Sequence, residues 1–305
     1  MLFYKSCNDG AWVYQHNKSP PLSVIINDNL KNHFMKHSFF FPLAMAMCAC
    51  QSDPVLDGSA IEEPVTITFT PYDMEPLTRT ATSISNYCSH LDVWLSDGTT
   101  TTSVHQGSAD AAFGSVSLTL NKTKTYTLYA VAHKCATDAT LADGIISFPD
   151  DKVTQTLWYT TTFSPATTTN VNALMQRIVA DFRLDITDEI PAAVKKLRFT
   201  VSEVFDRWSV TDGGTHSLNR VSTINYGGTS AIFNVYAIVT DAQTTHDITV
   251  EALTESDAVI QLRQFPSVPL RNGYKTTYRG QFFTDAAFTS TFTANDWYEY
   301  DVVDF

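Results

Sequence analysis

Basic residues are scarce in this chain, and the shortage excludes one class of partner. Lys and Arg together number 20 against 32 Asp and Glu, which gives a formal net charge of -12. A surface this acidic repels phosphate backbones instead of neutralising them. We therefore expect no nucleic-acid partner.

Cysteine is also scarce, and its spacing argues against a zinc site. The five cysteines are Cys7, Cys48, Cys50, Cys88 and Cys135, with no Cys-x-x-Cys pair and no Cys/His spacing typical of zinc. We expect no metal and no cofactor. Only Cys88 and Cys135 lie in the body of the chain beyond residue 50, where they either form a disulfide or serve as small buried hydrophobic residues.

Long apolar runs and helical patterns are missing as well. The apolar stretch at residues 38–47 soon gives way to polar residues 51–53, whereas a membrane-spanning helix needs about 20 apolar residues. Amphipathic patterns of helix length are nearly absent, so an α/β fold is a poor fit. A permanent transmembrane anchor is not expected.

Residues 35–49 have the pattern of a secretory signal peptide. A short positive head precedes the apolar stretch, and the small Ala49 stands directly before Cys50. Cys50 is the predicted lipidation site. Cys48 is a rival acceptor, disfavoured because the bulky Met47 precedes it.

The segments on either side of the signal follow from this prediction. Residues 1–34 carry no apolar run of their own, and we expect translation to start at Met35. Residues 50–64 are polar and include Pro54 and Pro64. We expect them to form a tether between the lipid and the first folded element.

Short strand-like segments dominate the next part of the chain. Residues 65–70 alternate apolar side chains with Thr, which is the period of two of a half-buried strand. Similar runs occur at residues 91–95, 114–120, 126–133, 156–163 and 178–186. Turn signals separate them, so residues 65–187 are predicted to form a sandwich or barrel.

A second series of strands begins after the polar, proline-containing interruption at residues 187–191. We place a domain boundary there, so that the second domain comprises residues 188–305. Its predicted strands are residues 197–201, 207–210, 231–239, 248–253, 274–283 and 288–292, with residues 297–303 closing the chain. The predicted fold class is all-β.

No constellation of reactive side chains accompanies these strands. The histidines are distributed over separate predicted strands and turns, with no recurrent Asp or Ser spacing: His90, His105, His133, His216 and His246. Each is predicted to be a surface or hydrogen-bonded residue instead of a catalytic base. We predict no catalytic residue and no enzyme.

Aromatic residues give the alternative to a purely structural role. Trp94, Trp158, Trp208 and Trp297 could form an exposed platform on which a sugar stacks. In a β-sandwich such residues more often belong to the core. A surface lipoprotein that binds glycan through exposed aromatics is therefore the second interpretation.

Three places in the chain resemble the Bacteroidetes fimbrillin superfamily. Within that superfamily they are most similar to the anchor or tip-associated group usually called the FimB/Mfa2 family. The first is the lipobox-like Cys50 followed by a tether and a strand. The second is Leu-Met-Gln-Arg-Ile-Val-Ala-Asp-Phe-Arg at residues 174–183, and the third is the segment at residues 265–283, where a Thr and a Gly precede an aromatic pair.

This resemblance implies two tandem transthyretin-like β-sandwich domains after a lipoprotein signal and a short tether. It implies export to the outer membrane, a palmitate-type lipid anchor at the cell surface, and a part in building a fimbrium with other fimbrial subunits. Anchor, assembly and tip roles all remain open, as do host or bacterial surface ligands.

The resemblance also implies a mechanism of assembly. In related stalk subunits a protease cuts after an Arg beyond the first strand, and a strand from a neighbour fills the groove that is left. Arg79 stands in the matching place. Since an anchor is expected to keep its lipid, the alternative is that Arg79 is an ordinary loop residue. Residues 297–305 are either a donated strand or the closing strand of the second domain.

Overall fold

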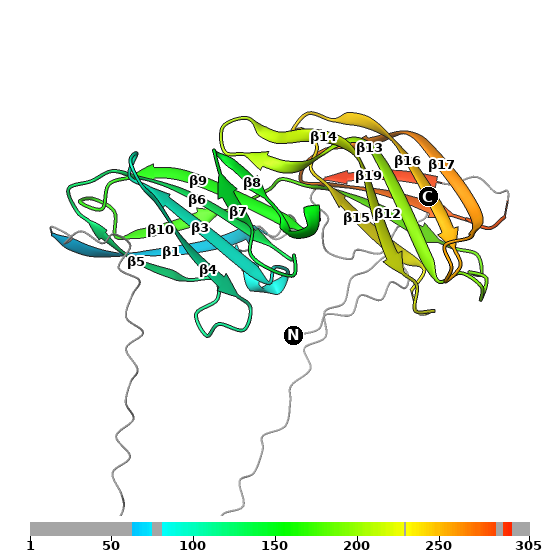
Figure 1. Cartoon of the computed structure of the whole chain (residues 1–305), viewed down its shortest axis with the longest axis horizontal. Helices are drawn as coiled ribbons and strands as arrows, with labels where there is room; N and C mark the ends of the chain where they lie inside the picture. The colour runs from blue at the N-terminus through cyan, green and yellow to red at the C-terminus, as the bar shows by residue number, and fades with distance from the viewer. Residues whose placement is uncertain (1–62, 75–80, 229, 285–288, 295–305) are drawn as a thin grey trace, which may run out of the picture. The chain divides into compact units, whose positions relative to one another are not determined.

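Strands make up most of the part of the chain that the structure describes. The computed structural model describes residues 63–74, 81–228, 230–284 and 289–294 (Figure 1). Within these ranges the helical elements are the short 3-10 turns η1 (Ile84–Asn86) and η2 (Pro149–Asp151). None of the described helices is long and apolar enough to cross a membrane. The all-β prediction is confirmed.

The first sandwich consists of two sheets. One contains β1 (Pro64–Met74), β2 (Ala81–Ser83), β5 (Val116–Asn121) and β10 (Asn170–Leu174). The other has the order β11-β9-β6-β3-β4, made of β3 (His90–Ser96), β4 (Thr101–Gly107), β6 (Tyr126–His133), β9 (Thr156–Phe163) and β11 (Gln176–Arg177). Their inward side chains form one core, which includes Ile67, Phe69, Leu91, Leu118 and Leu128.

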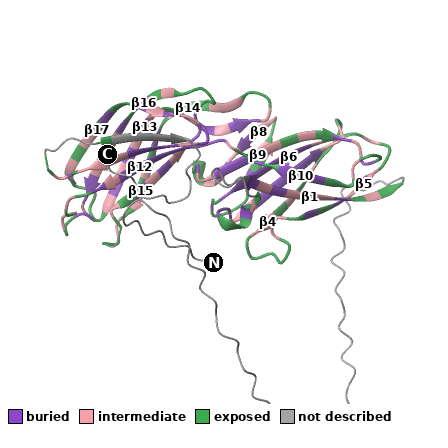
Figure 2. Cartoon of the chain, turned by 180° about the vertical axis from the view of Figure 1, so that it is seen from behind, coloured by how far each residue is buried: buried purple, intermediate pink, exposed green. Residues whose placement is uncertain are grey.

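The second sandwich is built in the same way. One sheet has the order β15-β12-β18-β19, made of β12 (Ala180–Ile186), β15 (Ile232–Ala237), β18 (Tyr274–Gly280) and β19 (Thr289–Ala294). The other contains β13 (Lys196–Ser209), β14 (Gly213–Asn225), β16 (Thr244–Leu253) and β17 (Val259–Leu270). Phe182 lies in its core, with its ring 5.9 Å from that of Phe265 and 5.7 Å from that of Tyr278. Figure 2 shows the buried positions of both sandwiches in purple.

The first strand of each sandwich occupies the same kind of position. β1 pairs antiparallel with β5 and parallel with β10. β12 pairs antiparallel with β15 and parallel with β18. The chain therefore repeats one arrangement, in which the opening strand lies in the middle of its sheet.

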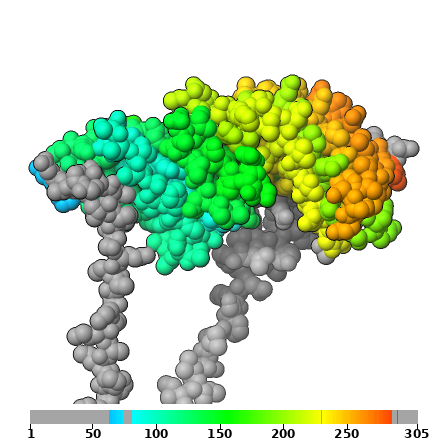
Figure 3. Space-filling model, in the orientation of Figure 1, coloured from blue at the N-terminus to red at the C-terminus, as the bar shows by residue number. Residues whose placement is uncertain are grey.

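A hairpin from the first half of the sequence joins the second sandwich. β7 (Thr140–Ala142) and β8 (Ile145–Ser147) pair with each other, and β8 pairs antiparallel with residues 207–209 of β13. A third apolar cluster lies beside this contact and contains Trp94, Trp158 and Trp208. In Figure 3 the green atoms of this region adjoin the yellow-green atoms of the second sandwich.

The structure corrects two of the predicted boundaries. The predicted domain limit between residues 187 and 188 assigns residues 180–186 to the first domain, whereas β12 pairs with β15 and β18 of the second sandwich. The two strands predicted at residues 197–201 and 207–210 are one strand, β13, with a bulge between Val201 and Val204. The bulge shifts the alternation of side chains, which reads in the sequence as a break.

Candidate functional site

β1 lies between neighbours that have no other strand partner in the described part of the chain. Residues 64–69 pair with β5, residues 68–72 pair with β10, and residues 72–74 pair with β2. β5, β10 and β2 each pair with β1 alone among the described strands. β1 therefore occupies a slot, and without it both β5 and β10 would present unpaired backbone groups.

The side chains of β1 also fill the core beneath that slot. Ile67 and Phe69 are fully buried, and the ring of Phe69 lies 6.2 Å from that of Tyr159 in the opposite sheet. Thr66, Thr68 and Thr70 alternate with them, as the period of two requires. An empty slot would combine exposed apolar surface with free hydrogen-bonding groups, which is what an added strand binds.

The end of β1 is held by a buried ion pair. Asp73 accepts a hydrogen bond from the guanidinium of Arg177 in β11, and both side chains are almost fully enclosed. The guanidinium of Arg177 also lies over the ring of Tyr87, 5.0 Å from its centroid. The backbone N–H of Met175 donates to the carbonyl of Tyr72 at 2.8 Å. These contacts add to the strand ladders that retain β1.

Several of the predicted site residues fall outside the described ranges. The lipidation site Cys50, its rival Cys48 and the candidate cleavage site Arg79 all lie there, as do residues 297–305. Their roles stay predictions. β1 ends at Met74 and β2 begins at Ala81, so Arg79 belongs to the connection between these two strands.

Cys88 and Cys135 are both buried and free. Cys88 belongs to the core of the first sandwich, whereas Cys135 belongs to the third cluster. Burial raises the pKa of the Cys88 thiol, and the Cys135 thiol donates to the carbonyl of Lys152 at 3.3 Å. Both are small buried residues in the structure, and the disulfide between them stays a prediction.

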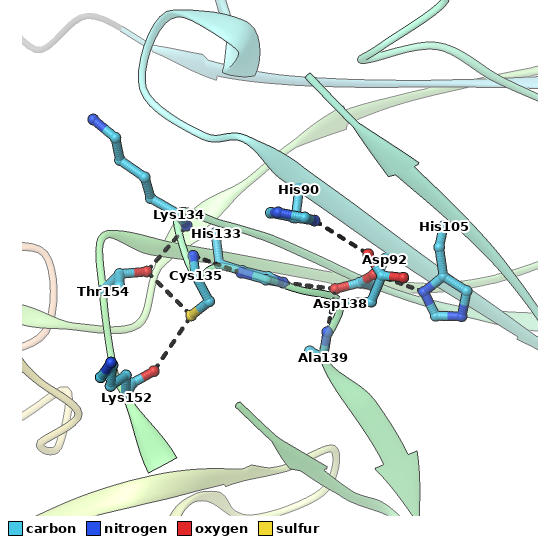
Figure 4. Close-up of polar contacts among 10 residues, drawn as sticks. All are labelled: His90, Asp92, His105, His133, Lys134, Cys135, Asp138, Ala139, Lys152 and Thr154. Atoms are coloured by element: carbon cyan, nitrogen blue, oxygen red, sulfur yellow. Dashed lines mark hydrogen bonds and ion pairs between the residues drawn. The ribbon is translucent and has the colours of Figure 1, made fainter. Parts of the chain in front are cut away.

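Three histidines that are far apart in sequence meet around one carboxylate (Figure 4). Asp92 in β3 has no exposed side-chain surface. His105 Nδ1 lies 2.6 Å from its Oδ1, and His133 Nε2 lies 2.7 Å from its Oδ2. The ring of His90 stacks on that of His133, with centroids 5.3 Å apart.

The hydrogen bonds assign the protons within this cluster. The backbone N–H of Cys135 donates to His133 Nδ1 at 3.1 Å, so Nε2 carries the ring proton and donates to Asp92. The N–H of Ala139 also donates to Asp92 Oδ2, at 2.9 Å. Burial alone would raise the pKa of Asp92, but the hydrogen bonds from His133 and His105 outweigh it and hold that pKa below its ordinary value.

This cluster does not have the arrangement of a nucleophile and its base. Both ring nitrogens of His133 are engaged and its ring is fully buried, while the Cys135 thiol donates to a backbone carbonyl. The prediction of a hydrogen-bonded histidine is therefore confirmed for His133. What the sequence did not reveal is the clustering itself, because Asp92 and His105 become neighbours through the β3–β4 register.

The tryptophans of the described chain lie in the core. Trp94, Trp158 and Trp208 are all buried, and the rings of Trp158 and Trp208 lie 6.2 Å apart. Trp297 lies outside the described residues. The expectation that these side chains are core residues is confirmed for the three described ones, and they do not form the exposed platform that the glycan-binding interpretation requires.

Comparison with solved structures finds matches of low sequence identity. A candidate cell adhesion protein from Bacteroides ovatus is 14% identical, with 80% of this chain and 100% of that chain covered and a TM-score of 0.48. The fimbrial anchor protein Mfa2 from Porphyromonas gingivalis is 10% identical, covers 77% and 98%, and has a TM-score of 0.44. A fimbrial assembly protein from Parabacteroides distasonis is 12% identical, covers 76% and 96%, and has a TM-score of 0.42.

No protein-family model and no curated protein matches the chain. Identities of 10–14% with TM-scores below 0.5 are too low to assign a family or a function.

Proposed function

We propose that this protein is a structural subunit of a cell-surface fimbrium, with an anchor, assembly or tip role, and that it joins other subunits by exchange of β-strands. The observation that carries the proposal is the position of β1. It is the first strand after the tether, and it is the only strand partner of β5 and β10 in the described chain. A strand in that position can be replaced by another of similar pattern without rebuilding the rest of the sandwich.

The physical chemistry of the slot supports this mode of binding. A replacing strand would regain the backbone hydrogen bonds to β5 and β10, which give affinity independent of sequence. Side chains at the positions of Ile67 and Phe69 would refill the core and give specificity. Neither step needs a catalytic group, which agrees with the proposal of a non-enzymatic protein.

The N-terminal sequence supports a lipid-anchored position at the outer membrane. Residues 35–49 have the pattern of a signal peptide, and Cys50 stands at the expected acylation site. One acyl chain holds a protein only weakly, but each buried CH₂ adds about 0.8 kcal/mol, so a multiply acylated cysteine can withstand tension from an attached fibre.

Mass spectrometry of the native protein's N-terminus tests where the mature chain begins. An acylated Cys50 is the result expected of a retained anchor, and a free Thr80 is the result expected of a subunit cut after Arg79. A mature chain that begins elsewhere and carries no lipid would contradict both forms of the proposal.

Loss of the gene tests the structural role itself. In a deletion strain we expect fimbriae that are missing, shortened or shed into the medium, as seen by electron microscopy of cells and culture supernatant. Complementation with the Cys50→Ala variant should restore the protein but not the attachment of fibres to cells. Unchanged, cell-attached fimbriae in the deletion strain would contradict the proposal.

A further inference from the structure

We propose that Asp92, His105 and Asp138 form a binding site for one divalent transition-metal ion, best suited to Zn²⁺. The three residues come from β3, β4 and the segment that leads into β7. One ligand atom from each of them lies within 4.8 Å of the others. The site is separate from the β1 slot and does not depend on the proposed fimbrial role.

The three side chains differ in how far they are exposed to solvent. Asp92 has no exposed side-chain surface, whereas His105 is 33% exposed and Asp138 is 49% exposed. The Asp92 carboxylate therefore has one defined position, and the other two groups can adjust to an incoming ion from solvent. In Figure 4 the carboxylates of Asp92 and Asp138 overlap in the view, with the ring of His105 beside them.

The ligand set selects the class of ion. One imidazole nitrogen and two carboxylate oxygens suit Zn²⁺, which takes His nitrogen at about 2.0–2.1 Å and carboxylate oxygen at about 2.0–2.2 Å. Ca²⁺ and Mg²⁺ prefer ligand sets made of oxygen alone. Three protein ligands leave the fourth tetrahedral position to water or to a neighbouring group.

Binding requires one modest rearrangement. His105 Nδ1 and Asp92 Oδ1 are now 2.6 Å apart across a hydrogen bond, whereas two ligands of a tetrahedral zinc ion lie about 3.3 Å apart. The ion would replace the proton between these two atoms. The neutral ring would then carry its proton on Nε2, and the partly exposed His105 can move the short distance required.

His133 and Ala139 hold the Asp92 carboxylate in one orientation. His133 Nε2 and the Ala139 N–H both bond to Oδ2, which leaves Oδ1 directed toward His105. Such outer contacts orient a coordinating carboxylate and raise metal affinity. At the exposed Asp138, His90 Nδ1 lies 3.1 Å from Oδ1 and would orient that carboxylate in the same way.

Metal binding would secure the connection to the β7–β8 hairpin. Asp138 immediately precedes Ala139, whose N–H already bonds to Asp92, and β7 begins at Thr140. That hairpin pairs with β13 of the second sandwich. An ion at this point would cross-link β3, β4 and the start of the connection, so we expect it to stabilise the folded chain.

Zinc titration of the chain beyond residue 50, purified without a metal-binding tag and stripped with a chelator, tests the proposal. Isothermal titration calorimetry should show one Zn²⁺ per chain, with no comparable binding of Ca²⁺ or Mg²⁺. Zinc at a hundredfold excess over its dissociation constant should raise the melting temperature by about 5–10 °C, and chelation should reverse the rise.

Two ligand variants and one matched control identify the site. His105→Ala and Asp138→Asn should each weaken zinc binding by at least about tenfold, the lower limit seen when even an outer partner is removed. Both residues are partly exposed, so the variants should fold. His216→Ala should bind zinc normally, because His216 forms the same kind of pair, 2.8 Å from Asp206 Oδ1, but belongs to no three-residue group among the described residues.

The outcomes separate a metal site from a hydrogen-bonded network. Weakened binding in both ligand variants, with normal binding in His216→Ala, supports the proposal. Absence of stoichiometric zinc binding, or binding that both ligand variants leave unchanged, would overturn it and identify the cluster as a hydrogen-bonded structural element alone.

Discussion

Asp73 at the end of β1 and Arg177 in β11 form a buried ion pair between residues that are 104 positions apart in the sequence. β1 belongs to one sheet of the first sandwich and β11 to the other. The pair therefore connects the two sheets at the point where β1 ends. Any event that removes β1 from its slot must also break this pair and leave the Arg177 guanidinium without Asp73.

Replacement of Arg177 by Met tests how firmly the end of β1 is held. The substitution removes one side of the buried ion pair, and breaking a buried pair in this way typically costs about 3–5 kcal/mol. We expect a lower free energy of unfolding in urea, and earlier proteolysis of the β1 region. The double variant Asp73→Asn/Arg177→Met should recover part of the loss, because residue 73 then carries no buried charge.

The Arg198–Glu251 pair provides the matched control. Arg198 Nε lies 2.6 Å from Glu251 Oε2, but the Arg198 side chain is 34% exposed. Exposed pairs contribute about 0–1 kcal/mol, so Arg198→Met should change stability little. Equal losses in Arg177→Met and Arg198→Met would contradict the role assigned to the buried pair.

Position 214 has no room for a side chain, so we expect it to require glycine. A Cβ atom at this position would lie 2.5 Å from Phe205 Cδ2 and 3.1 Å from Ile238 Cγ2. We expect Gly214→Ala to lower the free energy of unfolding by about 1–3 kcal/mol, the usual cost of overpacking. Gly227 has no neighbouring atom within 4 Å of the same position, so Gly227→Ala should be nearly neutral in the same urea titration.

Asp181 gives the second sandwich a pH dependence of defined sign. Burial raises the pKa of Asp181 to about 7. The positive charges of Lys275 and Arg183 lower this pKa and so offset part of the rise. In the unfolded chain the pKa of an Asp side chain is about 3.9. Between these values the folded state holds a proton that the unfolded state releases, so the contribution of Asp181 to stability falls as pH rises from about 4 to 7.

The Asp181→Asn variant tests this linkage. Its amide can keep the contact with Asn234, which now donates to Asp181 Oδ2 at 3.1 Å. We expect the melting temperature of the variant relative to the unmodified chain to rise steadily between pH 4 and 7. Asp143→Asn, at an exposed position, provides the control for the substitution itself. A pH-independent difference for Asp181→Asn would contradict the assignment.

The sequence predicted several strands close to the bounds that the structure has. β6 and β9 were predicted with the bounds that the structure has, and β1 and β3 to within a few residues. β14 and β17 were missed because most of their side chains are only partly buried or exposed, which leaves no apolar alternation to read. β7 and β8 were missed because three-residue strands are too short for a pattern.

The two candidate sites differ in how much of them the sequence could predict. The β1 slot follows from the alternation of residues 65–70, although only the sheet order shows that β1 is a central strand. The Asp92 cluster depends on strand register: Asp92 pairs with His105, and His90 pairs with His133. Register is set by the packing of whole sheets, so the spacing of these histidines along the chain carries no signal of it.

The proposed exchange of β1 can be tested directly by strand replacement. A specific protease site placed at Arg79 allows the folded chain to be cut after β1, and a labelled peptide with the β1 sequence, residues 64–74, is then added in excess. We predict that the peptide replaces β1 in a complex of one peptide per chain, whereas a peptide with Ile67→Asp and Phe69→Asp does not. A cut chain that unfolds irreversibly, retains its own β1 indefinitely or binds both peptides equally would contradict the account.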